Sequence, residues 1–322
     1  MAQQANHALP SGFLLDRYRI ERQLSLGGFS IVYLAADPEG QSVAIKEYLP
    51  NSLALRAAGE TKPVITEEHL PAFRYGMKCF FEEGRALAKL SHPNVIRVLN
   101  FFRANNTVYM VMEYEHGRTL QEFIQKNRAM ITENFMRNVF TKLLNGLREV
   151  HSHKLLHLDL KPSNIYMRND YTPVLIDFGA ARQTLTSDTP ILKPMYTPGF
   201  ASPEHYHRRK LLGPWSDIYS VGASMYACLA GTGPQAADSR REKDRLIPAM
   251  VRWEGQFSDQ LLEIVDWCLC LNHLYRPQSA FALQKALTEP VEHPKAPPPA
   301  DAGKKNWLGH VVGKLKRKAE TK

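Results

Sequence analysis

The spacing of apolar residues changes near Gly117. Before it, segments rich in β-branched and aromatic residues, such as "VAIKEYL" and "TVYMVMEY", alternate with turn residues and predict short strands. One helical pattern interrupts them between Met77 and Leu90. From Thr119 to Leu287 helical patterns dominate, as in "ENFMRNVFTKLLNGLREVHSH". We therefore predict an α+β fold with two lobes, a small strand-rich lobe followed by a larger helical lobe.

The composition suits a globular chain with a sizeable core. Of 322 residues, 44% are hydrophobic and 23% charged, and a chain of this length needs no disulfide to be stable. We expect four segments: an N-terminal extension at 1–15, the strand-rich lobe at 16–115, the helical lobe at 116–288 and a tail at 289–322. The tail begins with the Pro-rich run 290–300, which predicts an extended linker.

The start and the cysteines of the chain favour a cytoplasmic protein. The opening "MAQQANHALPSG" lacks the basic stretch and apolar core of a signal peptide. No apolar run reaches the ~18 residues that a membrane-spanning helix needs. The four cysteines form no CxxC pair, so we expect free, reduced thiols.

The positive charge is concentrated in the tail. The net charge is +9, and residues 303–322 contribute +6 through seven Lys/Arg and one Glu, which leaves +3 for the rest. Apolar residues at helical spacing among these lysines predict a basic amphipathic helix at 303–319. Such a helix suits an acidic partner or an anionic membrane surface, with peripheral attachment at its inner face. A solubilising tail explains the pattern equally well, and nucleic acid is disfavoured because the body lacks a basic face.

The segment "HLDLKPSNIY" carries side chains whose spacing suits phosphoryl transfer. Asp159 can accept the proton of an attacking hydroxyl, and Lys161 can neutralise charge on a transferred phosphoryl group. Asn164 can ligate a metal, and Asp177 in "VLIDFGAAR" is a second oxygen ligand of the kind that Mg²⁺ prefers. A loop carboxylate explains any one of these residues, but the ordered set predicts phosphoryl-transfer chemistry.

Two features of the strand-rich lobe could bind phosphates, and a third could support one of them. Gly27 and Gly28 allow backbone N–H groups to approach an anion, although an ordinary hairpin turn explains them as well. Lys46 lies in the middle of an apolar strand and needs an anionic partner if it points inward, whereas an edge-strand lysine would reach water. Glu83 beside the apolar stripe of the predicted helix offers that partner. A surface charge is the alternative, and Glu82 is the rival glutamate.

Together these residues resemble the protein kinase family, from about Tyr18 to about Leu287. Later landmarks agree: Ser202-Pro203-Glu204 resembles the end of an activation segment, Asp217 the aspartate that braces the catalytic loop, and Arg276 the arginine that pairs with Glu204. The resemblance implies the two-lobe protein-kinase fold.

The resemblance also implies an ATP site. Lys46 and Glu83 would clamp the α- and β-phosphates. The remaining positions are Val32 and Ala44 over the adenine, Met112 as gatekeeper, and Glu113 to Glu115 as the hinge. Tyr166 stands where an aliphatic residue usually lies beneath the adenine ring.

Two details resemble serine/threonine kinases: Lys161 follows Asp159, and Thr197 precedes Pro198. The phrases "GGFSIVYLA", "VAIKEYLP" and "DFGAARQ" are similar to Hanks-type kinases of bacteria. This implies transfer of the ATP γ-phosphoryl group to Ser or Thr of protein substrates, with autophosphorylation. It also implies Mg²⁺ (or Mn²⁺) as cofactor and a cognate protein phosphatase as partner.

Leu158 departs from the family pattern, because most kinases have an arginine there that meets a phosphorylated activation loop. A leucine cannot pair with a phosphate. Our hypothesis is that the segment 180–200 need not be phosphorylated for activity. Loop hydroxyls that could still be autophosphorylated are Thr184, Thr186, Ser187 and Thr189.

Other departures leave alternatives open. Ser25 and Ser30 replace two glycines of the family's phosphate-binding loop, which supports a pseudokinase that binds nucleotide or a partner without turnover. A small-molecule kinase is a third reading, disfavoured by "YTPGFASPE" and Arg276, which resemble a platform for protein substrates. The long stretch 47–82 is read either as an insertion that positions the helix or a partner, or as a decorated loop.

Overall fold

The computed structural model describes residues 6–178, 196–207 and 209–289. The predicted tail helix at 303–319 lies outside these residues. Every helix in the described ranges is too short or too polar to cross a membrane.

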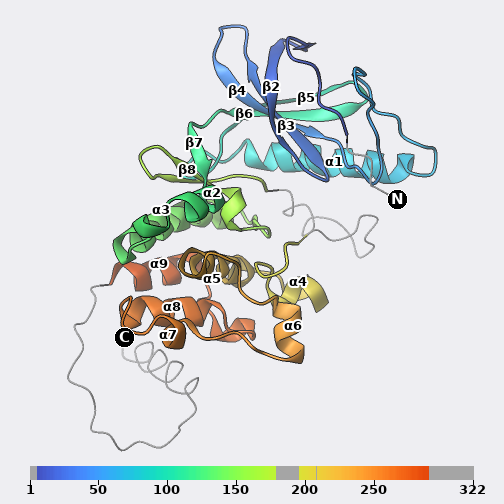
Figure 1. Cartoon of the computed structure of the whole chain (residues 1–322). Helices are drawn as coiled ribbons and strands as arrows, with labels where there is room; N and C mark the ends of the chain where they lie inside the picture. The colour runs from blue at the N-terminus through green and yellow to red at the C-terminus, as the bar shows by residue number, and fades with distance from the viewer. Residues whose placement is uncertain (1–5, 179–195, 208, 290–322) are drawn as a thin grey trace, which may run out of the picture. The chain divides into compact units, whose positions relative to one another are not determined.

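The chain divides into two compact units, and Figure 1 shows the elements of each. The first unit comprises the described residues up to Gly117, together with Arg168–Asp170 and 174–178. The second comprises Arg118–Met167, Tyr171–Pro173 and the described residues from Tyr196 onward. The first unit is built on a sheet and the second on helices, which confirms the predicted α+β fold.

The first unit contains a six-stranded antiparallel sheet in the order β1-β2-β3-β4-β6-β5. The strands are β1 (Leu14–Leu15), β2 (Tyr18–Leu26), β3 (Ser30–Ala36), β4 (Ser42–Tyr48), β5 (Val98–Ala104) and β6 (Thr107–Glu113). Strand β4 lies between β3 and β6 and is buried from Val43 to Tyr48. Since both of its faces are covered, its residues read as a continuous apolar run rather than as an alternating pattern.

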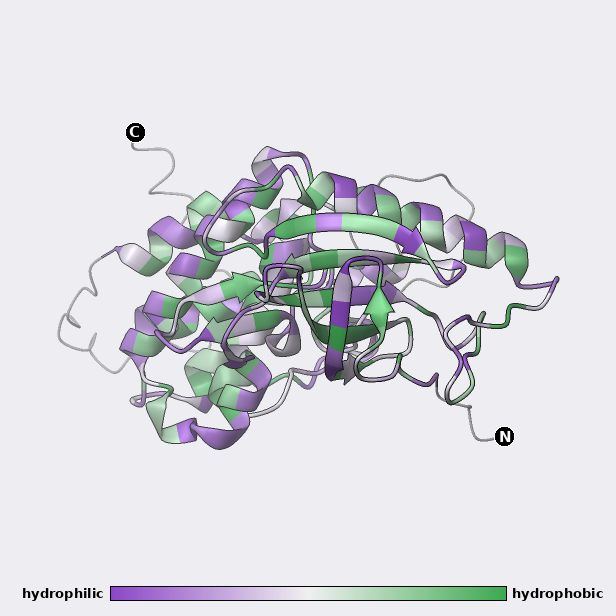
Figure 2. Ribbon diagram, turned by 90° about the horizontal axis from the view of Figure 1, so that it is seen from above, coloured by the Kyte–Doolittle hydropathy of each residue, from purple (hydrophilic) through white to green (hydrophobic). Residues whose placement is uncertain are grey.

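Helix α1 (Leu70–Leu87) packs against the sheet through its apolar stripe. Buried Phe73 and Phe80 lie against Tyr48 of β4, with ring centroids 5.3 and 5.9 Å away. Seen from above, the helix alternates between hydrophilic and hydrophobic residues (Figure 2). It begins earlier than the apolar pattern predicts, because Pro71 lies in the first turn, where its missing N–H costs no helical hydrogen bond.

Glu47 points away from α1, because successive strand side chains alternate between faces and Tyr48 faces the helix. Its carboxylate forms two ion-pair hydrogen bonds with the Arg56 guanidinium, at 2.6 and 2.8 Å. The hydroxyls of Tyr33 and Tyr109 also donate to it, each at 2.7 Å. Burial beside this carboxylate raises the pKa of both tyrosines, so they stay protonated donors.

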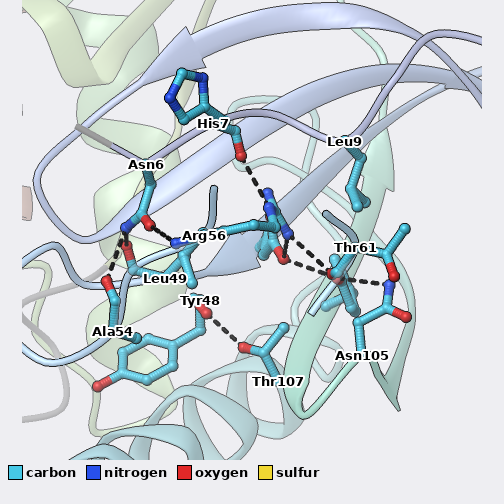
Figure 3. Close-up of polar contacts among 12 residues, drawn as sticks. Asn6, His7, Leu9, Tyr48, Leu49, Ala54, Arg56, Thr61, Asn105 and Thr107 are labelled. Carbon is cyan, nitrogen blue, oxygen red and sulfur yellow. Dashed lines mark hydrogen bonds and ion pairs between the residues drawn. The ribbon is translucent and has the colours of Figure 1, made fainter. Parts of the chain in front are cut away.

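The same arginine anchors the N-terminal segment (Figure 3). Arg56 donates through Nε to the His7 carbonyl at 2.8 Å, and its backbone N–H donates to Asn6 Oδ1 at 2.6 Å. The Asn6 amide donates in turn to the carbonyls of Leu49 and Ala54. The stretch between β4 and α1 is therefore tied both to the sheet and to the start of the chain.

The second unit is built from helices α2 (Leu120–Lys126), α3 (Glu133–Ser152), α4 (Pro203–His207), α5 (Pro214–Ala230), α6 (Ala237–Glu242), α7 (Ala249–Arg252), α8 (Asp259–Cys268) and α9 (Ala280–Thr288). Short 3-10 helices are Arg128–Met130, Pro162–Asn164, Arg209–Leu211 and His273–Tyr275. Short strands β7 (Gly117–Thr119), β8 (Ile165–Arg168) and β9 (Pro173–Leu175) lie where the chain passes between the units.

Several of these helices begin at capping residues. The Thr119 hydroxyl accepts the Glu122 N–H, and the Glu122 carboxylate accepts the Thr119 N–H, which forms a capping box on α2. Ser258 and Ser279 cap α8 and α9 through their hydroxyls. The Glu133 carboxylate at the start of α3 accepts the Ser258 N–H and O–H, at 2.8 and 2.6 Å, and so joins two helix starts.

Helix α5 runs through the core of this unit, and its residues from Ser216 to Leu229 are buried on all sides. Gly222 lies where α5 meets α8, and a Cβ there would lie 2.3 Å from the Cβ of Cys268. Only glycine allows this approach. The helix ends at Gly231, whose φ of 83° is the left-handed conformation common after a helix C-terminus. Near its start, α5 carries the buried Asp217.

Candidate active site

In the first unit, Lys46 and Asp177 form an ion pair. The distance from Lys46 Nζ to Asp177 Oδ1 is 2.6 Å, and the two side chains are 9% and 43% exposed. The ammonium also lies 6.0 Å from the centre of the Phe80 ring on α1. Lys46 therefore points inward toward the helix, and the reading of it as an edge-strand lysine that reaches water is wrong.

Glu83, the predicted partner of Lys46, lies on the buried face of α1 with Phe80. Glu82, the rival residue, is exposed. Burial favours Glu83 for the assignment, because a buried carboxylate needs a counter-charge or hydrogen-bond donors. Its pairing with Lys46 stays a prediction.

The predicted adenine-site residues lie on three neighbouring strands. Val32 of β3 is opposite Lys46 of β4, and Ala44 of β4 is opposite Met112 of β6. Glu113 ends β6 and is half-buried, as is Met112. In this register Val32 and Ala44 lie on adjacent strands, two residue pairs apart.

The carboxylate of Glu115, in the predicted hinge, is bound by Arg168. Arg168 Nε donates to Glu115 Oε2 at 2.6 Å, and Nη2 donates to Oε1 at 2.5 Å. The Glu115 carboxylate raises the pKa of the guanidinium through these bonds. Arg168 also donates to the carbonyl of Pro93. The Glu115 side chain is thus held by Arg168, and the role of this segment as the hinge stays a prediction.

Gly27 and Gly28 form the exposed turn between β2 and β3. The Gly27 N–H donates to the Ser30 carbonyl at 2.9 Å, and the Asn51 N–H donates to the Gly28 carbonyl at 2.9 Å. A Cβ at Gly28 would meet no atom of the described residues within 4 Å. Within the described part of the chain, the space beside Gly28 is therefore open.

In the second unit, Asp159 lies at the centre of a hydrogen-bonded group. Lys161 Nζ donates to Asp159 Oδ2 at 2.8 Å and to Thr197 Oγ1 at 2.7 Å. The Thr197 hydroxyl in turn donates to Asp159 Oδ1 at 3.0 Å. The sequence singled out Thr197 only as a mark of kinase type, and its contact with Asp159 was missed.

Asn164 is held against the same aspartate. Its Nδ2 donates to the Asp159 carbonyl at 2.9 Å and to Asp159 Oδ2 at 3.0 Å. The amide nitrogen is thus committed to the loop. The amide oxygen is the atom of Asn164 that suits a hard cation.

Asp217 braces the backbone just before Asp159. Its carboxylate accepts the N–H groups of His157 at 2.9 Å and Leu158 at 2.7 Å, and His151 Nε2 lies 2.8 Å from Oδ2. Burial alone would raise the pKa of Asp217, but the hydrogen bonds and charge of the histidines lower it below its usual value. The carboxylate is therefore ionised and fixes the loop from a rigid helix.

The end of the activation segment is fixed by a buried ion pair. Arg276 Nη2 lies 3.0 Å from Glu204 Oε1, and neither side chain is appreciably exposed. Arg276 also donates to the carbonyls of Trp215, Cys270 and Leu271. These contacts satisfy the buried guanidinium, and the pairing of Arg276 with Glu204 is the one that the resemblance predicts.

The predicted site is divided between the units. Lys46, Glu83 and Asp177 belong to the first, and Asp159 and Asn164 to the second. The predicted phosphorylation sites Thr184, Thr186, Ser187 and Thr189 lie outside the described residues.

A profile of the protein kinase domain matches residues 18–290. The chain is 29% identical to serine/threonine-protein kinase B of Synechocystis sp. over 294 residues, which cover 86% of this chain and 47% of that protein. It is 28% identical to probable serine/threonine-protein kinase PknB of Lactococcus lactis over 256 residues, 78% of this chain and 38% of that one. It therefore spans less than half the length of these curated relatives.

Among solved structures, the one titled "PpkA-294 apo form" has a TM-score of 0.77 and 33% identity, and the match covers 87% of this chain and 99% of that chain. This likeness confirms the predicted kinase fold. With the profile across most of its length and a solved relative matched almost end to end, the chain belongs to the protein kinase family.

Proposed function

We propose that this chain is a serine/threonine protein kinase, which transfers the γ-phosphoryl group of ATP to serine or threonine hydroxyls of proteins. The observation that carries the proposal is the hydrogen-bonded group of Asp159, Lys161 and Thr197. A carboxylate held in this way can accept a proton, and the neighbouring ammonium can offset the negative charge that develops during phosphoryl transfer.

In this proposal, Asp159 accepts the proton of the acceptor hydroxyl as the hydroxyl oxygen bonds to the γ-phosphorus. Lys161, whose Nζ lies 2.8 Å from Asp159, offsets the negative charge that gathers on the transferred group. A positioned general base contributes about 10²- to 10⁴-fold to a rate. Thr197 keeps both side chains in one arrangement.

Asn164 and Asp177 are the proposed ligands of a divalent metal, Mg²⁺ or Mn²⁺. The donor set fits, because an amide oxygen and a carboxylate are hard oxygen ligands, and Asp177 is partly exposed. When bound, the metal neutralises phosphate charge. Lys46, next to Asp177, would bind the α- and β-phosphates with Glu83 behind it.

The proposed nucleotide site is completed by the sheet. Val32 and Ala44 would cover the adenine, Met112 would act as gatekeeper, and the backbone from Glu113 to Glu115 would read the adenine edge. The proposed phosphate lid is the turn at Gly27 and Gly28. Its support is the open space beside Gly28.

We also propose that the kinase autophosphorylates but needs no phosphate on its activation loop. Leu158 supports this, because its buried side chain has no charge with which to hold a phosphate. Protein substrates with Ser or Thr acceptors and a cognate phosphatase are the proposed partners. We propose a cytoplasmic location, with the tail at 303–319 contacting an anionic inner membrane face or an acidic partner.

The test is phosphoryl transfer from Mg-ATP to acceptor proteins by the purified chain. Asp159→Asn should reduce turnover by at least 10²-fold. The exposed Glu254, far in sequence from the loop, gives the control Glu254→Gln, which should retain activity. Binding of ATP without turnover by the wild type would support the pseudokinase alternative instead. Transfer to small alcohols or amines but not to proteins would support the small-molecule kinase.

A further inference from the structure

A buried histidine links the end of the activation segment to the catalytic loop. His205 lies on α4, directly after the Ser202-Pro203-Glu204 sequence. Its Nε2 is 3.1 Å from the carbonyl oxygen of Leu158, and its Nδ1 is 2.9 Å from the Ser202 hydroxyl. His205, Ser202 and Leu158 are all buried, so water does not compete for these bonds.

The hydrogen-bond partners of His205 determine which ring nitrogen carries the hydrogen. A carbonyl oxygen can only accept, so Nε2 carries a hydrogen and donates to Leu158. In a neutral ring Nδ1 is then the acceptor, and the Ser202 hydroxyl donates to it. Burial lowers the pKa of His205 below its usual value, although Asp217 and Glu204 act in the opposite direction. A neutral Nε2–H ring therefore satisfies both of its partners.

The hydrogen bond acts on a strained point of the backbone. Leu158 has a φ of 61°, a left-handed conformation that non-glycine residues rarely adopt and that persists only where the surroundings enforce it. Its N–H is held by Asp217 at 2.7 Å, and its carbonyl by His205. The strained residue is thus fixed from both sides.

The carbonyl of Leu158 belongs to the peptide group that leads into Asp159. Because a peptide group is planar, fixing the direction of this carbonyl fixes the N–H and Cα of Asp159 as well. The bond from His205 therefore helps to fix the peptide plane from which Asp159 extends. Thr197, in the same segment as His205, donates its hydroxyl hydrogen to the Asp159 carboxylate.

We propose that His205 is a positioning residue for Asp159, which holds the catalytic loop from the end of the activation segment without a phosphate. Leu158 stands where the family has an arginine. In this chain, the neutral His205 ring binds the backbone carbonyl of Leu158 instead. The inference rests on the proposed kinase activity.

The test compares substitutions at His205. His205→Ala should lower kcat about tenfold or more and leave the KM for ATP within about twofold, because a misplaced catalytic group lowers the rate of the chemical step. In His205→Gln the amide Nε2 can still donate to the Leu158 carbonyl, so kcat should recover to within about threefold of the wild type. The exposed His153 gives the matched control His153→Ala, which should behave as wild type.

A merely structural role would lower the melting temperature of both His205 variants and reduce their activities equally. Equal kcat values in His205→Ala and His205→Gln, or a kcat for His205→Ala within twofold of the wild type, would overturn the proposal. An inactive wild type would instead refute the proposed function, so the two failures are distinct.

A measurement on the wild type covers the case in which His205→Ala does not fold. Nitrogen-15 NMR of histidine-labelled protein should show His205 as the neutral Nε2–H tautomer near pH 7. A neutral Nδ1–H tautomer or a charged ring would overturn the proposal, whether or not the chain is active.

Discussion

The side chains of Arg56 and Glu47 form a bidentate ion pair with no exposed surface. Glu47 directly follows Lys46 on β4, so the two neighbours point to opposite faces of the sheet. One face carries the proposed phosphate clamp, and the other carries the anchor of the N-terminal segment. The position of Lys46 therefore depends on the packing of both faces of β4.

Replacing Arg56 by Met should lower the free energy of unfolding by ~3–5 kcal/mol, because the Glu47 carboxylate would stay buried without its counter-charge. The double variant Glu47→Leu, Arg56→Met should lose less than the sum of the two single variants, since it leaves no buried charge. Urea unfolding measures all three. Strictly additive losses would show that the two side chains act independently.

The surface pair Arg97–Glu113 serves as the control. Its shortest N–O distance is 3.5 Å, and its side chains are 64% and 45% exposed. Water screens such a pair, so Arg97→Met should cost less than ~1 kcal/mol.

Asp217 makes the stability of the catalytic loop depend on pH. Its folded-state pKa lies below its usual value, whereas the unfolded chain titrates near ~3.9. The stabilisation is therefore fully present above the unfolded pKa and is lost as the pH falls through the folded pKa. Asp217→Asn cannot accept both backbone N–H groups, so it should cost about 1–3 kcal/mol at pH 7.

Unfolding curves of the wild type and Asp217→Asn from pH 3 to pH 8 measure this difference. The gap between the two proteins should shrink as the pH falls below about 5. A gap that widened in acid would mean that the carboxylate of Asp217 is not the stabilising form.

Thr197 should be needed for the rate and not for nucleotide binding. Thr197→Val removes the hydroxyl that bonds Asp159 and Lys161, and kcat should fall about 10-fold or more with little change in the KM for ATP. Thr197→Ser keeps the hydroxyl and should keep most of the activity. Equal losses in both variants, measured by steady-state kinetics, would show that the methyl group and not the hydroxyl matters.

Activation-loop phosphorylation should be dispensable. A chain with alanine at Thr184, Thr186, Ser187 and Thr189 should keep activity within about threefold, because Leu158 cannot bind a phosphate and His205 holds the loop without one. The measurement is turnover of the quadruple variant and of phosphatase-treated wild type, each compared with untreated wild type. Abolished turnover in the variant would refute the hypothesis.

The fold was accessible from the sequence, because periodicity and ordered motifs are local signals, and the same motifs supplied the proposed site residues. The apolar pattern predicts a helix from Met77, but α1 begins at Leu70, because a proline such as Pro71 suits the first helical turn. The sequence also contains a signal of the Glu47–Arg56 pair. Two adjacent charges in a buried strand must face opposite sides, and each needs a partner.

The contacts of Thr197 and His205 were not predictable in this way. Thr197 is separated from Asp159, and His205 from Leu158, by more than thirty residues of chain. Which side chain meets which partner depends on contacts between segments far apart in the chain, and no local pattern predicts such contacts. A histidine after Ser-Pro-Glu was visible, but its partner was a backbone group without a sequence signature.

The central claim, catalysis without the loop arginine, is tested most directly by incubating the purified chain with Mg-ATP and mapping phosphosites by mass spectrometry, beside Asp159→Asn. The account predicts phosphoserine or phosphothreonine in the wild type and none in Asp159→Asn. No phosphate in either protein, with ATP binding intact, would contradict it and indicate a nucleotide-binding scaffold. Equal phosphate in both would contradict the role of Asp159.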